Sequence, residues 1–138
     1  MPTIHKNKTF ATFLALTLGG LGVHRFYLRG PFDKLGMLHA ASVPVSGLVI
    51  GLAPDVHGFY QVLPVLISYV VGFLEALIVG LTPDEKFDAS FNAGSGKTSA
   101  SSWILAVLLV TTMLVGTTAL IATMSRLNDL LYTSGSFG

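Results

Sequence analysis

Two long apolar runs limit what this chain can fold into. Residues 103–124 contain no charged residue, and residues 60–81 contain only Glu75. A helix needs about 20 apolar residues to cross a hydrocarbon core of roughly 30 Å, and both runs are long enough. Two further runs, at residues 9–28 and 35–52, come close to that length. Only 11% of the residues are charged, against roughly a quarter in a soluble domain. The sequence therefore predicts an all-α integral membrane protein.

The order of these runs predicts a compact bundle of about four transmembrane helices, with a short basic and aromatic turn between the first two. Residues 1–90 form a membrane domain with spans near 9–28, 35–52 and 60–81. Residues 91–102 are a polar linker, and residues 103–138 add another transmembrane helix and a short tail. Pro44 leaves open whether the run at 35–52 is a kinked span or a re-entrant hairpin. Bulky residues follow the first run where small ones would precede a cleavage site, so we expect an uncleaved first helix.

Small residues recur along the predicted spans at a spacing that places them on one helix face. In lipid, helices associate through close packing along such faces, because no hydrophobic effect drives them together. The glycines that end the first run also favour a close approach of neighbouring backbones. The positions expected to pack helices are Gly19, Gly20, Gly22, Gly47, Gly51, Gly72, Ala76 and Gly80.

Glu75 lies inside a predicted span, about six residues or roughly 9 Å from its end. A carboxylate at that depth is costly and normally faces a partner or a water-filled cavity. Candidate partners at the same side of the membrane are His24, Arg25 and His39. We predict an ion pair between Arg25 and Glu75. Phe26 and Tyr27 either seal this pair at the headgroup boundary or form an ordinary aromatic belt, in which case Arg25 and Arg29 extend to the headgroups.

Several site chemistries are disfavoured. The segment GSGKT at residues 94–98 resembles part of a phosphate-binding loop, but that loop needs glycine where Phe91 stands. The four histidines lie in different elements and lack zinc-ligand spacing. The chain has no cysteine, and its net charge of +1 gives no nucleic-acid signal. We expect no metal, no cofactor, no nucleotide and no nucleic acid.

The basic residues give an expected orientation. If all four runs span, the chain ends share one side, which holds Lys6, Lys8 and Arg126. The opposite side holds a larger set of basic residues: Arg25, Arg29, Lys34, Lys86 and Lys97. The positive-inside rule then places this second side in the cytoplasm.

The run G-G-L-G-V-H-R-F-Y-L, after an apolar helix that begins near Lys6 and Lys8, resembles the signature of the TM2 domain family, called NINE proteins in prokaryotes. The segment GFLEALIVGLTPDEKFD resembles the family's acidic helix and polar stretch, with Glu75 at the acidic position. Arg29 departs from the usual pattern, which has glycine there. The usual domain has two hydrophobic segments, so the runs at 35–52 and after residue 102 are interpreted as additions. The lack of cysteine and of a cleavable signal resembles the bacterial forms.

The resemblance implies no established enzymatic activity, which leaves three hypotheses. The first is a non-enzymatic protein of the bacterial inner membrane, whose HRFY turn lies at the surface and binds lipid or protein. Its partners would be membrane lipids, with a second membrane protein or further copies of the chain left open. The second is a small transporter or ion-conducting oligomer with Glu75 and His39 as an intramembrane relay. The third, a membrane enzyme with His24 as base, lacks a second catalytic group. We favour the first.

Overall fold

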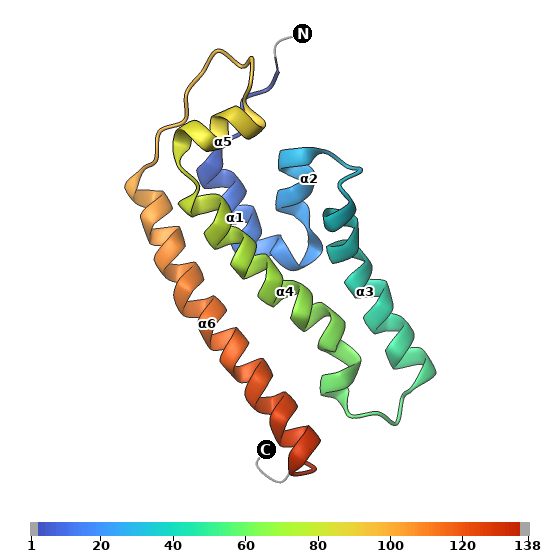
Figure 1. Cartoon of the computed structure of the whole chain (residues 1–138). Helices are drawn as coiled ribbons and strands as arrows, with labels where there is room; N and C mark the ends of the chain where they lie inside the picture. Colours follow the sequence, from blue (N-terminus) through green and yellow to red (C-terminus); the bar gives the residue numbers. More distant parts are fainter. Residues whose placement is uncertain (1–2, 136–138) are drawn as a thin grey trace.

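The computed structural model describes residues 3–135, and within that range the chain is helical without any β-strand. Helices account for 77% of the described residues. The predicted all-α membrane fold is therefore confirmed. Three helices among the described residues are long and apolar enough to cross a bilayer: α3 (Lys34–Leu52), α4 (Gly58–Leu81) and α6 (Trp103–Tyr132). Of the three, α4 lies between the other two, and α6 is the longest (Figure 1).

The first apolar run does not form a full-length helix, so three long helices replace the expected four. It forms α1 (Lys8–Leu18), a 3-10 turn η1 (Gly19–Leu21) and α2 (Val23–Arg29). The 11 residues of α1 rise only about 16 Å, roughly half of a hydrocarbon core. The chain then reverses, and α2 returns toward the end of the molecule from which α1 came (Figure 1). Residues 8–29 are therefore a re-entrant hairpin.

Glycine makes the reversal possible. Gly22 joins η1 to α2 with φ of +74°, a left-handed conformation that side chains with a Cβ rarely adopt. The tip of the hairpin packs tightly, because a Cβ on Gly22 would lie 2.5 Å from the carbonyl oxygen of Gly36 in α3. The glycines thus do more than pack a span: they turn the chain back inside the bundle.

The segment at 35–52, which the sequence left open, is one continuous helix. Asp33 caps α3 by accepting a hydrogen bond from the backbone N–H of Gly36 at 2.7 Å, and the helix continues through Pro44 to Leu52. It is long and apolar enough to span a bilayer and is not a re-entrant hairpin.

The hairpin changes which segments share an end of the molecule. Lys8 donates to the carbonyl oxygen of Thr82 at 2.9 Å and forms an ion pair with Asp84. The Asn92 side chain donates to the carbonyl oxygen of Lys6 at 3.0 Å. The N-terminal segment therefore lies beside α5 (Asp84–Phe91), at the end opposite the C-terminal end of α6 (Figure 1). The expectation that both chain ends share one side is wrong, because it assumed that the first run crosses the membrane.

The segment between α5 and α6 is held by hydrogen bonds. Asp88 accepts from the backbone N–H and the hydroxyl of Ser99, both at 2.6 Å. Asp84 accepts from the backbone N–H of Ser101 at 2.9 Å. These bonds hold the apparent GSGKT motif in a connection between two helices, with no strand before it.

Most of the small residues expected to pack helices do so. Gly19 touches Gly72, Gly20 lies against the Tyr69 ring, Gly80 meets Leu109, and Ala76 is fully buried. The prediction fails for Gly47 and Gly51, where an added Cβ would meet nothing within 4 Å. The reason is that α3 lies at the edge of the bundle, packed on α4, η1 and α2 within the described residues, so its other face is open at Gly47 and Gly51.

Candidate functional site

Three elements bring ionisable side chains together at Glu75. Its Oε2 atom lies 2.7 Å from Nε2 of His24 in α2 and 3.1 Å from Nε2 of His39 in α3. Its Oε1 atom accepts from Nε of Arg25 at 3.0 Å. The structure thus contains the contact between Arg25 and Glu75 that the sequence predicts, and it adds both candidate histidines to the same carboxylate. We call His24, Arg25, His39 and Glu75 the intramembrane cluster.

The intramembrane cluster is shielded from solvent. His24 is 1% exposed, and the side chains of Arg25, His39 and Glu75 are 13%, 7% and 18% exposed. In a low-dielectric setting an ionised carboxylate needs both an opposite charge and hydrogen bonds to its lone pairs. Glu75 has both, because Arg25 supplies the charge and the two imidazoles supply further polar contacts.

The hairpin explains why this cluster forms. The left-handed Gly22 starts α2 within the bundle, so that the first turn of α2 faces α4 at the depth of Glu75. Arg25 also lies 3.7 Å from the carboxylate of Asp33, the residue that caps α3. The guanidinium group of Arg25 therefore links α2 to the start of α3 and to α4.

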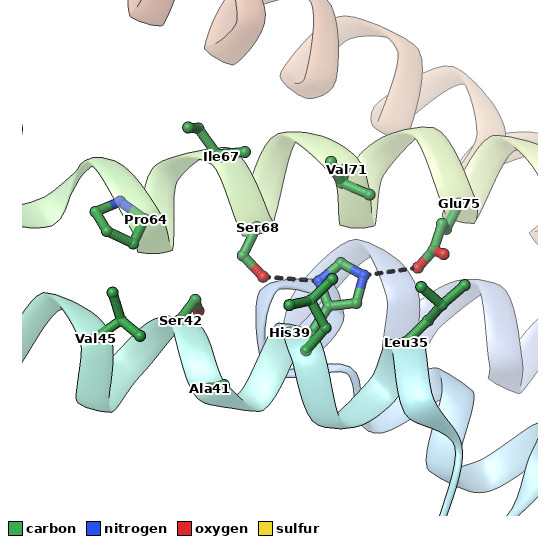
Figure 2. Close-up of a pocket in the computed structure, with 11 residues that line it drawn as sticks. Leu35, His39, Ala41, Ser42, Val45, Pro64, Ile67, Ser68, Val71 and Glu75 are labelled. Carbon is green, nitrogen blue, oxygen red and sulfur yellow. Dashed lines mark hydrogen bonds and ion pairs between the residues drawn. The ribbon is translucent and has the colours of Figure 1, made fainter.

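A hydrogen-bonded chain extends from the cluster to the hairpin tip. Nδ1 of His39 lies 2.7 Å from Oγ of Ser68, and that hydroxyl donates to the carbonyl oxygen of Gly20 at 2.7 Å. Figure 2 shows His39 between Ser68 and Glu75, with one ring nitrogen directed to each. The role of Ser68 as a polar partner of His39 was not predicted from the sequence. A usable signal was its spacing of two helical turns from Glu75, which places both on one face.

Two cavities flank Glu75. One, of about 420 Å³, lies between α3 and α4 and is walled by apolar side chains such as Leu35, Pro64 and Ile67, with His39, Ser68 and Glu75 among the lining residues (Figure 2). The other, of about 300 Å³, lies toward α5 and is lined by His24, Arg25, Glu75, Phe87 and Phe91 among others. The Glu75 side chain therefore lines two cavities, one between α3 and α4 and one toward α5.

The favoured hypothesis expected the HRFY segment to be a turn at the membrane surface. The structure instead places these residues in α2, where most of them contact other elements. His24 and Arg25 point inward to Glu75. Phe26 packs on α3 so closely that a Cβ on Gly36 would lie 2.7 Å from its ring. The Tyr27 hydroxyl accepts from the backbone N–H of Asn7 at 2.8 Å, which ties it to the N-terminal segment. The correction follows from the hairpin, because α2 is buried between other elements.

Arg29 is the exception in this segment. It is exposed, with its guanidinium group 5.6 Å from the centre of the Phe91 ring.

Among residues 3–135 no group of three or more His, Asp or Glu side chains has the arrangement to hold a metal ion. What the cluster can do is hold charge and protons inside an apolar bundle.

Comparison with known proteins identifies one family. A model described as TM2 domain matches residues 4–52, which confirms the resemblance that the G-G-L-G-V-H-R-F-Y-L run indicates. No curated protein and no solved structure matches the chain. The match includes the segment at 35–52, which therefore lies within the domain and is not an addition to it. It ends before α4, so Glu75 lies outside the matched residues.

Proposed function

We propose that this integral membrane protein, with a TM2 domain at residues 4–52, is a non-enzymatic protein of the bacterial cytoplasmic membrane that binds anionic lipid headgroups at its basic end. The observation that carries the proposal is the placement of its charge. Of the eight Lys and Arg residues, six lie at the end formed by the N-terminal segment, α2 and α5, Arg25 lies in the intramembrane cluster, and Arg126 lies at the opposite end. We call the end that holds the six the basic end.

The asymmetry supports an orientation with the basic end in the cytoplasm. Positively charged residues close to membrane spans are retained on the cytoplasmic side. The re-entrant hairpin adds Lys6 and Lys8 to that side, whereas the four-span arrangement placed them on the other. Compared with the four-span arrangement, the 82–102 segment stays on the proposed cytoplasmic side. The N-terminal segment moves to that side as well.

Four basic side chains of this end are exposed: Arg29, Lys34, Lys86 and Lys97. Each basic residue near an anionic leaflet gains about 1 kcal/mol, so four of them are attracted by about 4 kcal/mol. Arg25 and Lys8 do not contribute, because both are engaged with carboxylates inside the protein. Lipid binding is therefore assigned to exposed residues around α2 and α5, and not to the buried HRFY side chains.

The experiment compares two phospholipids. The purified chain in detergent is titrated with phosphatidylglycerol, which is anionic, or phosphatidylcholine, which is neutral overall, and its Tm is followed. We expect phosphatidylglycerol to raise the Tm more. A variant with Arg29, Lys34, Lys86 and Lys97 each replaced by Gln should lose that difference.

The matched control is Glu85→Gln, at an exposed acidic position on the same end. It should keep or increase the preference for phosphatidylglycerol. Equal Tm shifts from the two lipids in the wild-type chain would overturn the lipid proposal and favour a protein partner, such as another membrane protein or a further copy of the chain, at this end.

A further inference from the structure

Ser68 determines which ring nitrogen of His39 carries a hydrogen. The Ser68 hydroxyl donates to the carbonyl oxygen of Gly20, and a carbonyl oxygen can only accept. A hydroxyl has one hydrogen, so Ser68 Oγ is the acceptor in its contact with His39 Nδ1. His39 therefore carries a hydrogen on Nδ1.

The opposite ring nitrogen then faces a carboxyl oxygen. A neutral histidine with hydrogen on Nδ1 has a bare Nε2, which is an acceptor. Nε2 of His39 lies 3.1 Å from Oε2 of Glu75, and two acceptors at that distance repel each other. A proton must lie between them, either on Glu75 as a neutral carboxyl group or on His39 as an imidazolium. In both forms the pair holds one proton more than an ionised Glu75 beside a neutral His39.

The other groups around the pair do not take this proton. His24 donates to Glu75 through Nε2, and its buried Nδ1 has no hydrogen-bond partner among residues 3–135. A second proton on His24 would thus bury an unpaired N–H group, which is costly. Arg25 is always protonated, and Asp33 faces Arg25.

The remaining elements packed on α4 bring no further charge to the pair. Lys8 of α1 is paired with Asp84 at the basic end. Arg126 of α6 contacts His57 and Asp129 at the opposite end. The extra proton therefore belongs to Glu75 and His39.

The proton has routes by which to exchange. Glu75 lines both the cavity toward α5 and the cavity between α3 and α4. Ser42 follows His39 by one turn of α3 and lines the second cavity, and its buried hydroxyl has no partner within the described residues. Ser46, one turn further along α3, also has a buried hydroxyl without a hydrogen-bond partner among the described residues. These hydroxyls continue the polar face of α3 away from the cluster.

We propose that Oε2 of Glu75 and Nε2 of His39 form a proton-binding site within the membrane. The site binds one exchangeable proton, and Ser68 and the Gly20 carbonyl keep His39 in the tautomer that requires it. Release of the proton leaves two facing acceptors, which weakens the contact between α3 and α4 at this depth. The site goes beyond lipid binding at the basic end and does not depend on it.

The test reads the protonation of His39 directly. The full chain, labelled with ¹⁵N-histidine, is studied in detergent by NMR, where imidazole nitrogen shifts distinguish an N–H from a bare nitrogen. His39→Gln assigns the His39 signals. We expect His39 at neutral pH to carry hydrogen on Nδ1, with Nε2 either protonated or strongly hydrogen-bonded. A neutral His39 with hydrogen on Nε2 alone would overturn the proposal, because Ser68 would then donate to the ring.

Two serine variants test the cause. In Ser68→Ala the hydrogen of neutral His39 is free to move to Nε2 and donate to an ionised Glu75. The pair should then release its proton about one pH unit lower, since a net hydrogen bond corresponds to nearly one unit. Thr118→Ala is the matched control, because the Thr118 hydroxyl also donates to a backbone carbonyl oxygen but lies in α6, away from the pair, and it should leave the His39 signals unchanged. An unchanged midpoint in folded Ser68→Ala would contradict the proposal, while the wild-type spectrum decides the matter if that variant does not fold.

Discussion

Gly19 and Gly72 meet backbone to backbone at the tip of the hairpin. A Cβ on Gly19 would lie 2.9 Å from Cα of Gly72, and a Cβ on Gly72 would lie 2.8 Å from Cα of Gly19. Real side chains do not approach a backbone so closely, so neither position has room for a methyl group. This contact sets how closely the hairpin lies against α4, and with it the position of His24 and Arg25 beside Glu75.

Gly72→Ala should therefore destabilise the fold. The added methyl group must push the hairpin from α4, and overpacking of this kind costs about 1–3 kcal/mol. Gly47→Ala is the matched control, because its Cβ would meet nothing within 4 Å. Thermal unfolding in detergent should show a lower Tm for Gly72→Ala and no loss for Gly47→Ala. Equal effects would mean that the hairpin does not pack on α4 in this way.

The pair of Arg25 and Glu75 should show energetic coupling. Arg25→Ala and Glu75→Ala should each lower the free energy of unfolding, and the double variant should lose less than the sum. Coupling between polar groups in membranes reaches about 1–2 kcal/mol. Glu75→Ala should cost more than Arg25→Ala, because Glu75 contacts three side chains whereas Arg25 contacts two. The exposed Arg29→Ala serves as control, and strict additivity would contradict the pairing.

The hairpin predicts an odd number of membrane crossings. A reporter fused before residue 3 and one inserted at the exposed Gly96 should locate to the same side of the membrane. A reporter fused after α6 should locate to the other side. Four crossings would instead place the reporters at the two chain ends on one side, so the N-terminal fusion decides between the arrangements.

Acid should weaken the connection between α5 and α6. Hydrogen bonds from Ser99 and Asn92 lower the pKa of Asp88 to about 2. Since an unfolded aspartate titrates near 3.9, the stability that Asp88 contributes is complete above about pH 4 and is lost as the pH falls through about 2. Between pH 5 and lower pH values, the Tm of the wild-type chain should fall more steeply than that of Asp88→Asn. At pH 5 the Asp88→Asn variant should have the lower Tm. Glu85→Gln, on the same helix, should follow the wild-type curve.

Hydropathy predicted the long helices well, because the cost of placing polar groups in hydrocarbon depends mainly on composition and length. The segments at 35–52, 60–81 and 103–124 all lie within long helices of the structure. The partner of Glu75 was also predictable, since a carboxylate at that depth needs a cation and Arg25 was at hand.

The hairpin was not predictable from hydropathy, because an apolar run has the same composition whether the chain crosses or turns back. The deciding residue is Gly22, which adopts a left-handed conformation and packs closely against Gly36 and His39, neighbours that are distant in the sequence. The contact of His39 with Ser68 depends in turn on how α3 and α4 align, which no local pattern encodes. The error in the side of the N-terminus followed from the same missed turn.

The hairpin also bears on the order in which the chain enters the membrane. Its tip places the non-α-helical backbone of η1 and Gly22 at membrane depth, and such backbone is tolerated only where protein covers it. The cover is α4, which the ribosome makes later. We therefore expect residues 8–29 to remain at the membrane surface during synthesis. They would pack into the bundle only after α3 and α4 have been inserted. The hairpin is thus translated before the helix that covers it, and its burial in the bundle follows the synthesis of α4.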